Sequence, residues 1–227
     1  MCINGGNIIN FQQPSFAPSS ADLQRITRTV APHHHLFFED DARTHLFVVE
    51  SGWAKLYRTL IDGQRQVVGF CNGGSILGLE GSAGYANGCE AVTQLKVRAI
   101  PIAKLSEICG RDPDLADQLI RQIGRQLGTA QTQLTTIGAQ SAQQKLATFL
   151  LAFAEYSGSD EFDLPVRRID IAEFLGLRLE TVSRKMTELQ QMKWIRMVSM
   201  YRCRILRRDI LQYLADGGDH REFAAAC

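Results

Sequence analysis

The sequence lacks the features of a membrane or secreted protein. No apolar run among its 227 residues approaches the ~18 residues that a membrane-spanning helix requires. The first residues show no basic segment followed by an apolar one, as a secretory signal would. We therefore expect a cytoplasmic protein without a membrane partner.

Metal-binding and catalytic patterns are also scarce. Six cysteines are scattered without C-x-x-C spacing, which argues against a zinc site, and in a cytoplasm they should be free thiols. No acid pair, catalytic triad or phosphate-binding loop is recognisable, so we predict that the protein is not an enzyme. The residues that could ligate a metal or haem are His33, His34, His35 and His45. Side chains alternate along a strand, so at most two of the first three could share a site. We favour a polar loop and predict no metal and no cofactor.

Charge is balanced overall and basic in one region. The net charge of +1 neither favours nor excludes a nucleic-acid partner. Cations dominate residues 167–208, where only four acids occur: Asp170, Glu173, Glu180 and Glu188. The cations are Arg167, Arg168, Arg178, Arg184, Lys185, Lys193, Arg196, Arg202, Arg204, Arg207 and Arg208. Such a local patch is what counterion release from DNA requires.

The stretch Ile169–Trp194 has the pattern of two short helices joined by a tight turn. The first ends at Gly176, whose freedom at positive φ lets the second cross it steeply. The second begins near Leu179 and places Val182, Met186 and Leu189 on one face. Side chains on its other face could read base edges in a major groove, although a solvated helix face is the alternative. The predicted DNA contacts are Glu180, Ser183, Arg184, Thr181, Arg178, Lys185 and Arg168.

Short β segments follow a loose, polar N-terminal tail. LFVVESGWAKLYR, RQVVGFC and KVRAIP are predicted strands, and IDGQ (61–64) is a hairpin turn centred on Asp-Gly. Several strands at this spacing favour a β-roll or barrel over a parallel sheet.

A long helix is predicted beyond Asp112, its candidate cap, and Pro113. Apolar residues recur there in the alternating steps of a coiled coil, and the positions between them, such as Gln122, are polar. The seam is therefore narrow and fits a partner helix, although a helix lying on its own β domain is the alternative. We predict a parallel homodimer through Ile120, Ile123, Leu127, Ala130, Leu134 and Ile137.

The remaining segments suggest a winged domain. We expect a helix over 141–156, a loop at SGSDEF, a short strand at LPVRR (164–168), a β-hairpin over 195–206 and a last helix at 208–214. Cys203 lies in this hairpin between Arg202 and Arg204, a positive setting that favours a redox-active thiolate. Strand alternation, however, turns Cys203 toward the core with Tyr201 and Ile205. We favour a structural thiol and keep redox control as the alternative.

This order of a β-roll, a long helix and a winged helix-turn-helix resembles the cyclic-AMP receptor and FNR family of bacterial transcription regulators. The resemblance spans about residues 25–214, and its most specific parts are GQRQVVGF (63–70), GGSILGLEGSAG (73–84) and GLRLETVSR (176–184). It implies an α+β fold with a cyclic-nucleotide-binding-like β-roll, a dimerisation helix and a winged helix-turn-helix. The implied domains are a tail (1–24), the β-roll (25–111), the dimerisation helix (112–139) and the DNA-binding domain (140–227).

The Glu-x-x-Ser-Arg signature formed by Glu180, Ser183 and Arg184 is similar to the FNR and FixK branch of that family. This likeness implies a homodimeric activator that binds the palindromic double-stranded site TTGAT-N4-ATCAA, with RNA polymerase as a further partner. It also implies control of genes for low-oxygen or nitrogen metabolism.

The chain departs from the family where effectors bind. Gly78 is followed by Leu79 instead of Glu, and NGCE before Ala91 contains no arginine, so a cyclic phosphate has no charged partner. Only Cys2 lies near the N-terminus, whereas the FNR iron–sulfur cluster needs four thiolates. His33 and Asp40 replace turn glycines. We expect DNA binding without cyclic AMP or a cluster. The alternatives are a redox-, haem- or metal-responsive member, or a β-roll ligand-binding module without DNA readout.

Overall fold

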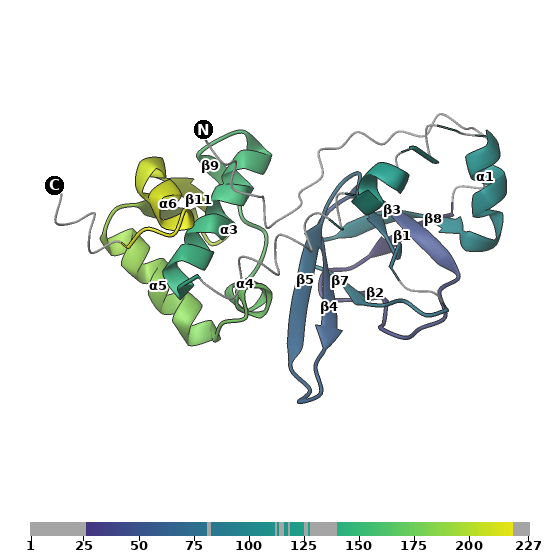
Figure 1. Cartoon of the computed structure of the whole chain (residues 1–227), viewed down its shortest axis with the longest axis horizontal. Helices are drawn as coiled ribbons and strands as arrows, with labels where there is room; N and C mark the ends of the chain where they lie inside the picture. The colour runs from purple at the N-terminus through teal and green to yellow at the C-terminus, as the bar shows by residue number, and fades with distance from the viewer. Residues whose placement is uncertain are drawn as a thin grey trace. The chain divides into compact units, whose positions relative to one another are not determined.

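The computed structural model describes residues 26–80, 83–111, 113, 116–117, 119–124, 127 and 140–219. The chain divides into two compact units (Figure 1). The first is Asn10–Gly128, and the second consists of Thr129–Cys227 together with Met1–Ile9. Several sequence predictions lie outside the described residues: the tail, Asp112, Cys2, Cys227 and the seam residues Ala130, Leu134 and Ile137.

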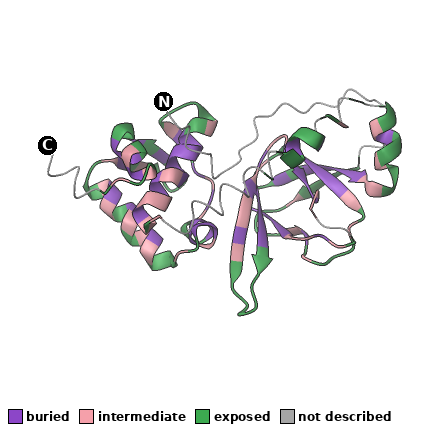
Figure 2. Cartoon of the chain, viewed as in Figure 1, coloured by how far each residue is buried: buried purple, intermediate pink, exposed green. Residues whose placement is uncertain are grey.

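Two four-stranded antiparallel sheets form the first unit, in the orders β1-β8-β3-β6 and β2-β7-β4-β5. Their strands are β1 (Ile26–Val30), β2 (His35–Phe37), β3 (His45–Ser51), β4 (Ala54–Thr59), β5 (Arg65–Cys71), β6 (Ile76–Leu77), β7 (Gly88–Ala91) and β8 (Leu95–Pro101). The strands are buried along the middle of the sandwich, whereas the tip of the β4–β5 hairpin is exposed (Figure 2). The predicted β-roll is confirmed.

Strand alternation places a core on each face of the first sheet. Phe47 and Val49 of β3 face the second sheet and join the sandwich core. Their neighbours Leu46 and Val48 face the other way and pack with Ile108 of a short helix. The strand is therefore apolar along its middle because both of its faces are covered.

Turns occur where the sequence provides residues that tolerate positive φ. LFVVESGWAKLYR is two strands, because Gly52 turns the chain at a φ of 90° where a Cβ would collide with the Gln94 carbonyl. The predicted Asp-Gly hairpin turn is confirmed, with Gly63 at a φ of 81°. His33 and Asp40 also have positive φ, 65° and 66°, as expected for positions that replace turn glycines.

Helices cover the outer face of the first sheet. The 3-10 helix η1 (Ile102–Lys104) leads into α1 (Leu105–Arg111), a helix that was not predicted from the sequence. The described positions from 113 to 127 are also helical, as predicted. Leu119 is buried in the core beneath them, whereas Ile120, Ile123 and Leu127 are 68%, 52% and 60% exposed.

One polar side chain attaches this helix to the sheet. The Gln122 amide donates to the Ile76 carbonyl over 2.8 Å, and its oxygen accepts from the Ile76 amide over 3.2 Å. Gln122, which the sequence shows only as a polar position between the seam residues, is buried. β6 is a short edge strand, and Ile76 has no neighbouring strand on its outer side. The Gln122 side chain takes the place of that strand and satisfies the amide and the carbonyl of Ile76. The same contact turns the apolar residues Ile120, Ile123 and Leu127 away from the sheet.

The second unit is a helical domain with a three-stranded sheet in the order β10-β11-β9. Its elements are α3 (Ala142–Ser157), β9 (Glu161–Asp163), α4 (Arg168–Leu175), α5 (Leu179–Gln191), β10 (Ile195–Ser199), β11 (Arg202–Ile205) and α6 (Arg208–Ala215). Ser141 caps α3 in a reciprocal capping box with Gln144. α3 is the central helix and contacts α4, α5, α6 and β9. The predicted helix-turn-helix, wing and last helix are all present.

The short strand was predicted in the wrong place. It occupies Glu161–Asp163, whereas 164–167 are irregular and Arg168 already begins α4. Pro165 has no amide to donate to a sheet, which disfavours a strand there. Asp170 stabilises the start of the helix instead, because its carboxylate accepts from the Arg167 amide over 3.0 Å.

Replacing Gln122 by Ala should lower the stability of the first unit. The substitution leaves the buried amide and carbonyl of Ile76 without partners, which costs about 1–3 kcal/mol. The measurement is the urea midpoint of the β-roll transition, with Gln64→Ala at the exposed hairpin as the control of the same residue type. Equal midpoints for the two variants would contradict the role of Gln122.

Candidate DNA-binding site

The helix-turn-helix is formed by α4, a three-residue turn and α5. Gly176 ends α4 in the left-handed region at a φ of 63°, and its amide donates to the Ala172 carbonyl. Arg178 precedes α5 in an extended conformation, and the Thr181 and Val182 amides donate to its carbonyl. The turn thus has the backbone that the sequence predicted from Gly176.

α5 has one buried and one exposed stripe. Val182, Met186 and Leu189 are each no more than 1% exposed. On the opposite side, Glu180 and Arg184 are exposed, whereas Ser183, Thr181 and Lys185 are half-buried at its flanks. The structure therefore brings five of the predicted contacts together on α5, with Glu180 and Arg184 most accessible.

Two further residues continue the exposed stripe. Thr187 and Gln191 follow Glu180 and Arg184 at helical spacing and are exposed. These two residues were not predicted, because the Glu-x-x-Ser-Arg signature ends at Arg184. Counting from Glu180 in alternating steps of four and three residues leads to Arg184, Thr187 and Gln191, so the helical period alone could have identified both residues.

Most cations of the basic region are paired with acids in the described chain. Glu161 of β9 pairs with both wing arginines, Arg202 and Arg204, and the hydrogen bond from Arg204 lowers the pKa of its carboxyl. The other pairs are Arg167–Asp170, Arg184–Glu188, Lys185–Glu188, Arg207–Asp209 and Arg208–Asp160. The patch is less positive than its sequence suggested, because several of these acids lie outside 167–208.

Four cations of the region remain available. They are exposed and make no ion pair with another described residue: Arg168, Arg178, Lys193 and Arg196. Arg168 is the first residue of α4 and Arg178 is the N-cap of α5. Helix N-termini carry unpaired amides and partial positive charge, so these two positions suit contacts with phosphate.

Cys203 lies inside the winged domain. It is fully buried on β11 beside Ile205, whereas Tyr201 lies in the turn before the strand and is 49% exposed, so its predicted inward orientation was wrong. Burial raises the pKa of the Cys203 thiol to about 12. These observations favour the structural thiol over the redox-active one.

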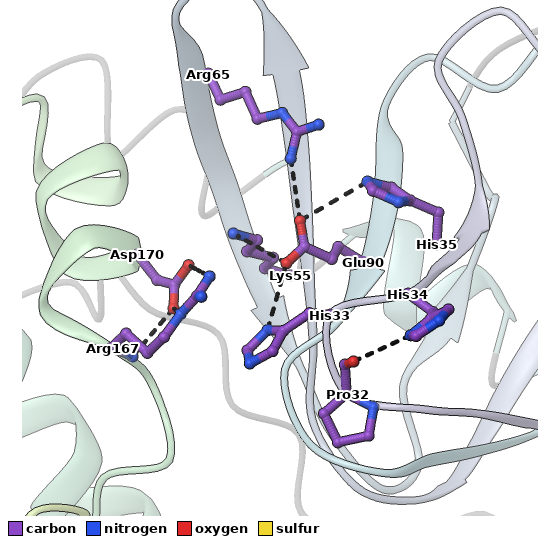
Figure 3. Close-up of polar contacts among 9 residues, drawn as sticks. All are labelled: Pro32, His33, His34, His35, Lys55, Arg65, Glu90, Arg167 and Asp170. Atoms are coloured by element: carbon purple, nitrogen blue, oxygen red, sulfur yellow. Dashed lines mark hydrogen bonds and ion pairs between the residues drawn. The ribbon is translucent and has the colours of Figure 1, made fainter.

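Two of the three consecutive histidines, His33 and His35, belong to an ion-pair cluster around Glu90. His33 Nδ1 and His35 Nε2 each lie 3.7 Å from the carboxylate of buried Glu90, which Lys55 and Arg65 also approach (Figure 3). Burial is the main cause that lowers the pKa of His35. Lys55 and Arg65 thus occupy the positions around the Glu90 carboxylate that a metal would need. Among the described residues, no three His, Cys, Asp or Glu side chains are arranged to hold a metal ion.

The other two histidines lie apart from this carboxylate. His34 Nδ1 is 3.1 Å from the Pro32 carbonyl, and His45 Nδ1 is 2.9 Å from the Thr44 hydroxyl. The prediction that at most two of the three consecutive histidines share a site agrees with this geometry.

The loop between β6 and β7 presents an acid and no cation of its own. Residues 76–91 contain no Arg or Lys. Arg43 reaches this loop, but it donates to the Gly78 carbonyl over 2.7 Å and to the Leu79 carbonyl over 3.3 Å. Burial raises the pKa of Glu80 in the same loop. Arg43 therefore supports the loop backbone, and residues 76–91 provide no cation for a cyclic phosphate.

Comparisons with known proteins agree with this architecture. Residues 27–112 match the cyclic nucleotide-binding domain family and residues 144–214 the Crp-like helix-turn-helix domain family. The chain is 33% identical over 190 residues to the nitrogen fixation regulation protein FixK of Azorhizobium caulinodans, covering 81% of this chain and 77% of the relative. The chain belongs to the CRP/FNR family of transcription regulators.

Further relatives lie in the same branch of the family. The transcriptional activatory protein AadR of Rhodopseudomonas palustris is 33% identical over 184 residues, covering 77% of this chain and 76% of the relative. The solved structure of FixK2 from Bradyrhizobium japonicum superposes with a TM-score of 0.77 at 27% identity, covering 85% of this chain and 98% of that one. The protein is thus a FixK-like DNA-binding transcription regulator. None of its described helices is both long and apolar enough to cross a bilayer.

We expect the Cys203 thiol of this regulator to be inert in the folded protein. With a pKa of about 12, only ~10⁻⁴ of it is thiolate at pH 8. A thiol reagent followed by peptide mass spectrometry should label Cys203 in denaturant and leave it unlabelled in buffer. Cys203→Ser should leave any effect of mild peroxide on DNA binding unchanged. Rescue from peroxide by this substitution would instead support redox control.

Proposed function

We propose that this protein is a homodimeric activator that binds the palindrome TTGAT-N4-ATCAA without cyclic AMP or an iron–sulfur cluster. The observation that carries the proposal is the exposed stripe of α5, where Glu180 and Arg184 lie on the side opposite the buried Val182 and Met186. The FixK and AadR relatives support a regulator of nitrogen fixation or a related activator. RNA polymerase is the proposed second partner, and the cytoplasm the proposed location.

Different side chains carry different parts of the recognition. Glu180 accepts from a cytosine amino group, Arg184 donates to a guanine or phosphate, and Ser183 packs beside a thymine. Arg168 and Arg178 hold phosphates at the helix N-termini and set the register without reading sequence. Thr181 and Lys185 flank this surface and contact the backbone of the duplex.

The dimer interface is proposed along the apolar face of the helix beyond Pro113. Ile120, Ile123 and Leu127 are exposed there in alternating three- and four-residue steps, although they are large aliphatic side chains. Ala130, Leu134 and Ile137 continue the same seam in the sequence. Burial of this stripe against a second copy follows the pattern of a coiled coil. Two-fold symmetry then places two α5 helices on successive turns of DNA, roughly 34–36 Å apart.

Independence of effectors rests on the β-roll. The β6–β7 loop has no cation, contains Glu80 and uses Arg43 for its own backbone. Cys71 and Cys89 lie in the roll, where burial raises the pKa of both thiols, while Cys203 is in the other unit. Cys71 is near enough to Cys89 to contribute to its raised pKa, but a cysteine-ligated cluster normally needs four thiolates. We propose that binding to DNA is then controlled by the amount of protein in the cell.

Replacing Glu180 by Ala should relax the preference for one base pair in each half-site. A good base contact is worth about 1–3 kcal/mol, so affinity for the palindrome falls while affinity for unrelated DNA hardly changes. The measurement is fluorescence anisotropy on the palindrome and its single-base variants, using aerobically purified protein without cyclic AMP. Unchanged base preference would contradict the role of Glu180. A wild type that binds only after cyclic AMP, or iron and sulfide, is added would contradict effector independence.

Replacing Leu127 by Glu should produce monomers that bind the palindrome weakly. The substitution brings two carboxylates together in an apolar seam, where they lose hydration without gaining a partner. Leu60→Glu is the matched control. Leu60 is also an exposed leucine, with 46% of its surface exposed compared with 60% for Leu127, but it lies at the β4–β5 hairpin. Sedimentation velocity measures the result. A dimeric Leu127→Glu variant would show that the seam is wrongly placed.

A further inference from the structure

Glu188 is an acid on the reading helix that the proposed recognition does not use. It lies one turn beyond Arg184 and Lys185 and contacts both. Its Oε1 is 3.8 Å from Arg184 Nε, and its Oε2 accepts from Lys185 Nζ over 2.5 Å. One carboxylate therefore holds two adjacent cations with separate oxygens.

The position of Glu188 is unfavourable for the helix itself. It lies in the last turn of α5, where the negative end of the helix dipole repels an acid and where no basic residue occurs. An acid that follows its cations along the helix also stabilises less than one that precedes them. Both effects are small and have the same sign, so these ion pairs add little to the stability of α5.

We propose that Glu188 is a positioning residue that fixes the side chains of Arg184 and Lys185 for base recognition and reduces their attraction for phosphates of arbitrary sequence. This inference rests on the proposed DNA readout by α5. Arg184 is 69% exposed, so without Glu188 its long side chain samples many rotamers and meets any phosphate within reach. The pair holds the guanidinium along the helix and lowers the net charge of the exposed stripe by one.

Three variants separate positioning from charge. Glu188→Gln removes the charge and weakens both pairs. Glu188→Asp keeps the charge but is one methylene shorter, so it cannot meet both cations. Glu155→Gln is the matched control, because Glu155 is an exposed glutamate of α3 in the same unit with no ion pair to a described residue. Each protein is titrated with the palindrome, its single-base variants and a non-specific duplex from 50 to 300 mM salt.

We expect Glu188→Gln to bind the non-specific duplex at least about threefold more tightly, with a log–log salt slope steeper by about one for each half-site. The ratio of specific to non-specific affinity should fall about tenfold. Glu188→Asp should keep the wild-type slope and lose preference at the base pair read by Arg184. Glu155→Gln should match the wild type in both respects.

Two results would overturn the inference. Glu188→Gln with wild-type slope and ratio would show that Glu188 does not affect recognition. If Glu188→Asp behaved like the wild type while Glu188→Gln was altered, Glu188 would act only through its negative charge and would not position the two cations. A wild type without sequence preference would contradict the proposed function instead, and the salt slopes on the non-specific duplex would still decide whether Glu188 neutralises the cations.

Discussion

Burial of Val182, Met186 and Leu189 is the constraint on which the presentation of α5 depends. A helix turns 100° per residue, so once this stripe packs against α3 and α4 every other side chain of α5 has a fixed direction. Each buried aliphatic side chain contributes about 1.5–3 kcal/mol, whereas an exposed ion pair contributes about 0–1 kcal/mol. Packing therefore decides which side of the helix faces outward, and pairs such as Arg184–Glu188 adjust only the side chains on it.

A comparable constraint sets the direction of the helix beyond Pro113. Leu119 and Gln122 face the sheet, and the two reciprocal hydrogen bonds between the Gln122 side chain and the Ile76 backbone fix the rotation of the helix about its axis. Hydrogen bonds are directional, whereas apolar burial is not. The single amide of Gln122 therefore fixes the rotation of the helix, which a second buried leucine in its place would not do. The consequence is that Ile120 and Ile123 remain on the outer side, where a second chain can reach them.

The parts that could be predicted from the sequence are those written in local periodicity. The break at Gly176, the stripe of α5 and the Asp-Gly hairpin each depend on residues within one or two turns of one another, and all are confirmed. The contacts that the sequence did not reveal join distant residues. Gln122 and Ile76 are 46 positions apart, and Glu161 and Arg204 are 43. Periodicity states that a position is polar or apolar, but it does not state which distant backbone or charge that position meets. For this reason the sequence identified Gln122 as a polar position without identifying its partner Ile76, and the basic region was predicted to be more positive than it is.

Neutralisation of the wing arginines changes how affinity and specificity are balanced in this protein. Glu161 pairs with both Arg202 and Arg204, and Asp163 also pairs with Arg202, so these two cations do not add freely to the attraction for phosphate. Each neutralised phosphate contact contributes about 0.9 to the slope of log affinity against log salt on any sequence, and each unpaired cation thus raises specific and non-specific binding together. Base contacts act only on the correct site. On this surface a few unpaired cations, such as Arg178, lie at helix N-termini, and the others are paired with acids. Such a surface has a lower affinity for DNA of any sequence and keeps its preference for the correct site. In a genome where competing sites outnumber the target by many orders of magnitude, that ratio determines occupancy more than the affinity itself.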